Sequence, residues 1–101
     1  MRAVAKRPGE PGKVITIEND LKALQEYVGG YIETLTFSPA ACVICNEEGR
    51  IIGLPYNMTF AGHRFCGPIL IVGVKGEEFT DCPAPGFIMD VINKGVCHET
   101  R

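Results

Sequence analysis

Four side chains between residues 55 and 67 have the types needed to hold an anionic ligand. Tyr56 and Asn57 begin this stretch, and His63 and Arg64 follow near its end. A guanidinium binds phosphate or carboxylate through paired hydrogen bonds, and an aromatic ring can stack on a base. We therefore expect these four residues to contribute to a ligand site. The alternative is a solvated loop whose phenylalanine side chains pack on the core, and the sequence leaves both interpretations open.

Glu33 also stands out, because it interrupts an apolar face. In a strand over residues 31–37, Tyr31, Glu33, Leu35 and Phe37 would point to the same side. One interpretation is that Glu33 lines a pocket, where burial would raise the pKa of its carboxyl group. The other is that Glu33 lies at the strand end and reaches solvent or an arginine. We include Glu33 and its face neighbour Tyr31 among the candidate ligand-binding residues.

The cysteine spacing raises the question of a metal site. Cys42 and Cys45 form a Cys-x-x-Cys motif, and such pairs bind zinc when a tight turn lets both sulfurs converge. The Val-Ile between them favours a strand, on which residues i and i+3 point to opposite faces. We therefore expect reduced thiols, no bound metal and no cofactor. The residues that could have completed a zinc site are His63, Cys66, Cys82, Cys97 and His98.

Catalytic motifs are missing from the sequence. It contains no nucleophile elbow, no phosphate-binding loop and no His-x-x-x-His pattern. General acid–base chemistry by Glu33 with His63 stays open, although their spacing does not indicate it. We expect a protein without catalytic residues.

The composition indicates one domain without a nucleic-acid or membrane signature. The chain has 101 residues, of which 46% are apolar, and a net charge of −2 at pH 7. Nucleic-acid-binding domains often have a pI above ~9, whereas this sequence has a pI of about 5.6. No apolar run approaches the ~20 residues that cross a bilayer, and no signal-peptide pattern is present. We expect a cytoplasmic location, with no membrane partner and no nucleic-acid partner.

The elements that would position the candidate residues make an α+β fold. We predict a small, twisted, mainly antiparallel sheet of five to six strands with two helices packed on it, in the chain order β-β-α-β-β-β-β-α. Prolines and glycines at residues 8–12 predict a turn, so residues 2–17 should form a β-hairpin. Asp20 is a suitable N-cap and Gly29 a suitable stop, which together predict a helix over residues 20–28.

The second half of the chain also shows signals for strands, turns and a helix. A hairpin turn at 46–49 should join two strands, a polar and aromatic loop should follow, and a continuously apolar stretch should form the central, doubly buried strand. Pro85 suits the first position of a last helix that Gly95 would end. The predicted ranges are strands at 31–37, 41–45, 50–54 and 68–74, a loop at 55–67, and a loose tail at 96–101.

Several short motifs follow one another along residues 2–75. They are Asn19-Asp20-Leu21, Leu24-Gln25, Val28-Gly29-Gly30-Tyr31-Ile32-Glu33, Cys45-Asn46-Glu47-Glu48-Gly49, Gly53-Leu54-Pro55-Tyr56-Asn57 and Gly67-Pro68-Ile69-Leu70-Ile71-Val72-Gly73. Their order resembles the domain-of-unknown-function family 3846 (DUF3846). That family occurs in phages, plasmids and the bacteria that carry them, so the resemblance implies a mobile-element accessory protein and supplies no catalytic residues.

These observations lead to one hypothesis and two alternatives. The leading hypothesis is a non-catalytic protein that binds and sequesters a small anionic ligand. The mobile-element context suggests a nucleotide signal of a host defence system as that ligand. The alternatives are a protein-interaction module that inhibits a host enzyme and a small nucleotide hydrolase. A thin core and open strand edges also favour a homo-oligomer, with a two-fold dimer as the first expectation.

Overall fold

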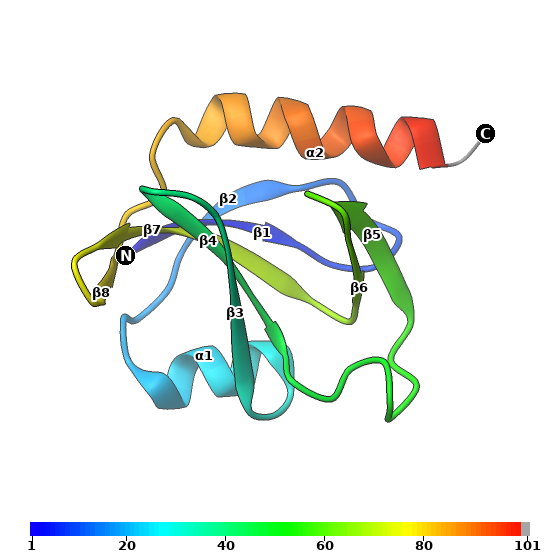
Figure 1. Ribbon diagram of the computed structural model, residues 1–101, viewed down its shortest axis with the longest axis horizontal. Helices are drawn as coiled ribbons and strands as arrows, with labels where there is room; N and C mark the ends of the chain where they lie inside the picture. Colours follow the sequence, from blue (N-terminus) through cyan, green and yellow to red (C-terminus); the bar gives the residue numbers. More distant parts are fainter. Residues whose placement is uncertain (100–101) are drawn as a thin grey trace.

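The computed structural model describes residues 1–99, with side chains described for residues 1–93 (Figure 1). Its strands pair only in antiparallel fashion within the described residues. The elements are β1 (Arg2–Lys6), β2 (Lys13–Thr16), α1 (Leu21–Val28), β3 (Ile32–Ser38), β4 (Ala41–Asn46), β5 (Tyr56–Phe60), β6 (His63–Cys66), β7 (Ile69–Lys75), β8 (Glu78–Thr80) and α2 (Pro85–Glu99).

The main sheet is built around β7. Its strand order is β2-β1-β7-β4-β3, and β8 pairs with the end of β7, which gives six strands within residues 1–99. The apolar run of β7 is buried along Ile69–Val72, because both faces of the sheet are covered there. The predicted α+β class, the central position of this strand and the N-terminal hairpin are confirmed.

Helix α1 covers one face of the sheet, below it in Figure 1. The Asp20 side chain accepts a hydrogen bond of 2.7 Å from the Ala23 N–H, and Gly29 ends the helix with a φ of 82°. Leu24 and Val28 are buried against residues of β1, β4 and β7. The predicted caps therefore begin and end this helix as expected.

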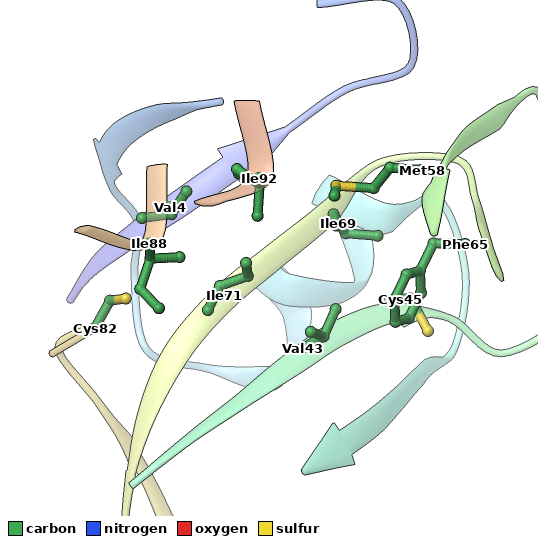
Figure 2. Close-up of a cluster of buried hydrophobic side chains, with 10 residues drawn as sticks. All are labelled: Val4, Val43, Cys45, Met58, Phe65, Ile69, Ile71, Cys82, Ile88 and Ile92. Carbon is green, nitrogen blue, oxygen red and sulfur yellow. The ribbon is translucent and has the colours of Figure 1, made fainter. Parts of the chain in front are cut away.

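Helix α2 and the β5–β6 hairpin cover the opposite face (Figure 1). Figure 2 shows the apolar side chains that meet there, with the Phe65 ring of β6 next to Cys45 of β4. Phe37 and Phe60 add an edge-to-face ring contact with centroids 5.0 Å apart. The buried members of this cluster are Val4, Val43, Cys45, Met58, Phe65, Ile69, Ile71, Cys82, Ile88 and Ile92.

Two predicted elements between residues 50 and 67 are wrong. Residues 50–53 form turns instead of a strand, with the Ile52 N–H donating to the Glu48 carbonyl and the Leu54 N–H to the Gly49 carbonyl. The predicted loop at 55–67 is largely a hairpin made of β5 and β6. Ala61 and Gly62 form its two-residue turn, both with positive φ (52° and 79°) as a type I′ turn needs.

Helix α2 also differs from its prediction. It begins at Pro85 as expected but continues through Gly95 to Glu99. A glycine inside a helix costs only ~1 kcal/mol relative to alanine, so it does not by itself end one. Of the predicted tail at 96–101, residues 96–99 fall within α2 and residues 100–101 lie outside the described residues.

A buried lysine ties the hairpin to the main sheet. Lys6 is only 1% exposed, and its Nζ donates to the Asn57 Oδ1 at 3.0 Å and to the Arg7 carbonyl at 2.9 Å. The Asn57 amide in turn donates to the carbonyls of Lys6 and Gly67, both at 2.8 Å. Burial lowers the pKa of Lys6, while the negative charge of Glu10 acts in the opposite direction. A shift in strand register between Tyr56 and Met58 lies at Asn57.

Replacing Asn57 with alanine should destabilise the fold by about 1–3 kcal/mol, because a buried ammonium and two carbonyls would each lose a partner. Urea unfolding followed by circular dichroism would measure the loss. Asn19→Ala is a matched control, since the Asn19 amide also donates to a backbone carbonyl. Its hydrogen bond to the Phe79 carbonyl is 2.9 Å long and exposed. Equal losses for the two variants would contradict a special role for the buried network.

Candidate functional site

A cleft of about 540 Å³ opens between the main sheet and the β5–β6 hairpin, and we call it the hairpin cleft. Strands β3 and β4 supply one side, β6 the opposite side, and the turns after β4 supply one end. Figure 1 shows how the hairpin stands beside these strands. The lining residues are Glu33, Leu35, Cys45, Asn46, Glu47, Gly49, Arg50, Ile51, His63, Arg64, Phe65 and Cys66.

The turns at residues 47–53 follow β4, and we call them the turn segment. The Asn46 side chain holds the start of this segment, and Gly49 brings it close to β6. The Asn46 amide donates to the Val28 carbonyl at 3.1 Å, and its Oδ1 accepts from the Glu48 N–H at 2.7 Å. At Gly49 a Cβ would lie 2.6 Å from the Cys66 carbonyl oxygen. Only a glycine fits this close approach, which places Arg50 and Ile51 at the cleft.

The positive charge in the hairpin cleft comes from β6 and from the turns after β4. Arg64 lies on β6 and Arg50 on the turn segment, and both line the cleft. The Arg64 guanidinium lies 4.4 Å from the centroid of the Tyr56 ring, a cation–π contact that restricts its motion. The Tyr56 hydroxyl is itself 2.9 Å from the Thr59 Oγ1. One of the two guanidiniums is therefore partly ordered before any ligand arrives.

The negative charge comes from Glu33 on β3 and Glu47 on the turn segment. Glu33 lies opposite Cys45 in the β3–β4 ladder. The pKa of the Cys45 thiol is raised from 9.0 to about 11. Burial is the larger cause, and the negative charge of Glu33 is the smaller one. The thiol therefore stays protonated near neutral pH and is a poor nucleophile there.

The raised pKa of Cys45 makes stability fall at high pH. The unfolded chain releases this proton near pH 9, whereas the folded chain keeps it until about pH 11, so the stabilisation is complete below pH 9 and is lost as the pH rises through 11. The shift corresponds to about 3 kcal/mol. Urea midpoints measured from pH 8 to 11 should decrease more steeply for the parent than for Cys45→Ala. Parallel pH profiles would contradict the assignment.

Three of the six candidate ligand-binding residues share the hairpin cleft, namely Glu33, His63 and Arg64. Tyr56 lies beside it, under Arg64. Asn57 is 6% exposed and its amide is hydrogen-bonded within the protein, so we leave it out of the site. The cleft also contains Arg50, Glu47 and Ile51, which no sequence pattern indicates because only the folded turn segment brings them to β6.

Tyr31 lies in a separate hollow of about 300 Å³, which we call the α1 hollow. It lies at the end of α1, where the chain turns into β3. The Tyr31 side chain is 68% exposed. The residues that line this hollow are Gln25, Gly29, Gly30, Tyr31, Asn46, Glu48 and Ile52. Tyr31 therefore does not contribute to the hairpin cleft.

The Cys-x-x-Cys motif lies on β4, as its Val-Ile pair predicted. Cys42 is buried in the cluster between α1 and the sheet, and Cys45 is buried in the cluster on the other face. The two sulfurs therefore point away from each other, which confirms the strand argument. Within the described side chains, no three His, Cys, Asp or Glu residues gather closely enough to hold a metal ion. Cys97 and His98 lie outside those side chains.

The fold and the cleft define a small α+β protein with an open, mixed-charge cleft beside its sheet. The family model described as "Domain of unknown function (DUF3846)" matches residues 1–89. The chain belongs to this family. Comparison with curated proteins and with solved structures finds no match. Neither helix within residues 1–99 has the length and apolar character needed to cross a membrane.

Proposed function

We propose that this protein binds a small anionic ligand of the nucleotide class in the hairpin cleft and does not convert it. The observation that carries the proposal is the presence of two guanidiniums, Arg50 and Arg64, in one cleft of about 540 Å³. Small-molecule sites commonly have volumes of ~300–1,000 Å³, with a few polar groups set among apolar ones. Guanidinium groups bind phosphate oxygens through paired hydrogen bonds.

The apolar part of the cleft suits the rest of such a ligand. Leu35, Ile51 and Phe65 line it together with the charged residues. A nucleoside has a flat ring that can lie on apolar or aromatic side chains, and hydroxyl and amine groups that can donate to carboxylates. Glu33 and Glu47 provide such acceptors. A purely anionic ligand would not use these carboxylates.

The thiol in the cleft offers no nucleophile near neutral pH. The pKa of Cys45 is raised to about 11, mainly by burial, so this thiol is protonated near neutral pH. Sequestration of a ligand needs only affinity and abundance. In the mobile-element context that the family resemblance implies, a host defence signal made of nucleotides would be a fitting ligand.

The proposal is tested by thermal melting with a panel of nucleotides. A ligand that binds only the folded chain stabilises it, by ~2.7 kcal/mol at a ligand concentration of a hundred times the Kd. The melting temperature therefore rises with ligand concentration. We expect millimolar nucleoside phosphates to raise the melting temperature more than inorganic phosphate or sodium chloride at equal ionic strength. Native mass spectrometry of the freshly purified protein would detect a ligand that is already bound. No shift with any nucleotide and no added mass would refute the proposal.

A second candidate function is docking on a protein partner. Large apolar side chains are exposed around the turn segment, with Ile51 83% and Ile52 57% exposed, and the exposed Tyr31 ring lines the α1 hollow with Ile52. A patch of this kind often marks an interaction site. A captured host protein in native mass spectrometry, lost in Ile52→Asp, would favour this function. The two-fold dimer stays a prediction, for which β2 and β3 offer the edges of the sheet.

A further inference from the structure

We infer that the hairpin cleft prefers ligands with a guanine base, and that Glu33 is the residue that recognises it. This inference rests on the proposed function and names the class of ligand for the same cleft. It follows from where the carboxylates lie relative to the guanidiniums and to the apolar lining, and from the hydrogen-bonding pattern of the four common bases.

Glu33 lies at an apolar part of the cleft. It is an exposed residue of β3 opposite Cys45, and Leu35 follows two positions later on the same side of the strand. Leu35 packs against the core cluster that contains Cys45 and Phe65, and all of these residues line the cleft. Figure 2 shows that the Phe65 ring and Cys45 are neighbours. A flat ring lying on this apolar surface would place its edge within reach of the Glu33 carboxylate.

The guanidiniums belong to other elements than Glu33. Arg64 is on β6 and Arg50 is on the turn segment, whereas Glu33 is on β3. A ligand that spans the cleft therefore meets positive charge from β6 and the turns, and a carboxylate from β3. A nucleotide has this polarity, because its phosphate is anionic and its base can donate hydrogen bonds. Inorganic phosphate lacks the donor end and would be repelled by the carboxylate.

An ionised carboxylate accepts hydrogen bonds only, and its two oxygens match two parallel donors. The Watson–Crick edge of guanine offers two neighbouring donors, N1–H and the N2 amine. Adenine and cytosine offer one amine beside a ring acceptor, and uracil offers one N–H between two carbonyls. Guanine is thus the common base that satisfies both carboxylate oxygens. The energy of a bidentate pair to a base corresponds to roughly 5- to 150-fold discrimination.

Calorimetric titration with GMP, IMP and AMP tests this assignment at one ionic strength. IMP keeps N1–H but lacks the N2 amine, so it isolates the second hydrogen bond. We expect the parent to bind GMP about tenfold or more tightly than IMP, and IMP more tightly than AMP. Glu33→Gln presents an amide to the base donors, and it should lower GMP affinity to within about threefold of IMP while AMP affinity stays the same.

Glu47→Gln is the matched control, because Glu47 is a second exposed carboxylate in the same cleft. It should keep the preference for GMP, and both variants should melt at the parent temperature since both positions are exposed. Equal affinities for the three nucleotides, or a preference that survives Glu33→Gln or is lost in Glu47→Gln, would overturn the inference and leave the proposed function standing. Failure of the parent to bind any of them at millimolar concentration would overturn the inference, and the wider nucleotide panel with native mass spectrometry would then decide the proposed function.

Discussion

Arg64→Ala is expected to weaken nucleotide binding about ten- to a hundredfold. A hydrogen bond to a charged group contributes roughly 1.5–3 kcal/mol, and each 1.4 kcal/mol is a tenfold change in affinity. The effect should lie towards the upper end, because the Tyr56 ring, 4.4 Å from the guanidinium, already restricts this side chain in the free protein. Calorimetric titration of parent and variant with the tightest nucleotide of the panel would measure it.

Two further variants separate charge from geometry. Arg64→Lys should recover only part of the affinity, since an ammonium keeps the charge but loses the planar fork. Arg7→Ala is the matched control, because Arg7 also lies over a tyrosine ring, 4.7 Å from the centroid of Tyr27, and does not line the hairpin cleft. Unchanged affinity in Arg64→Ala, or an equal loss in Arg7→Ala, would show that Arg64 does not hold the ligand.

Gly73→Ala should be among the most destabilising single changes in the chain. Gly73 lies in the central strand β7, where a Cβ would overlap the backbone carbonyl oxygen of Asp81 and come within 2.9 Å of the Thr80 Cγ2. Overpacking of this kind typically costs 1–3 kcal/mol, and backbone atoms cannot rotate away as a side chain can. A loss of 2–3 kcal/mol corresponds to a melting temperature roughly 10–20 °C lower.

A second glycine-to-alanine change provides the control for Gly73→Ala. Gly86 lies in the first turn of α2, and a Cβ there would meet no atom within 4 Å. Alanine favours the helix and reduces the freedom of the unfolded chain, so Gly86→Ala should raise the melting temperature slightly or leave it unchanged. Equal melting temperatures for the two variants would mean that β8 and the chain after it can move away from β7 at little cost.

Elements whose signals are local could be predicted from the sequence. Helix α1 has a capping aspartate at Asp20 and a glycine at Gly29 with φ of 82°, and both act within one turn of the helix. Strand β7 follows from its own apolar run. Hairpin β5–β6 was missed because its turn is Ala61-Gly62, and alanine at a φ of 52° has no sequence signature.

The turn segment shows the opposite error. Ile51, Ile52 and Leu54 suggested a strand because β-branched and apolar residues favour one. The folded chain instead leaves Ile51 exposed. The Glu48 N–H donates to the Asn46 side chain, and this bond and the close fit of Gly49 to Cys66 hold the turns. The contacts of Gly49 with Cys66 and of Asn46 with Val28 join residues that are far apart in the sequence, so the local pattern does not predict them. For the same reason Glu33 could be selected from the strand pattern, whereas Arg50 could not.

The opposite orientation of Cys42 and Cys45 gives the protein two internal reporters. Cys42 is covered by the layer that contains α1, and Cys45 by the layer that contains Phe65 of the hairpin. An alkylating reagent can reach the Cys42 sulfur only when the α1 layer moves away from β4, whereas Cys45 is approached from the hairpin cleft that it lines. The modification rate of Cys42 would therefore measure how often the α1 layer opens, and a ligand bound in the cleft would slow the reaction at Cys45 but not at Cys42.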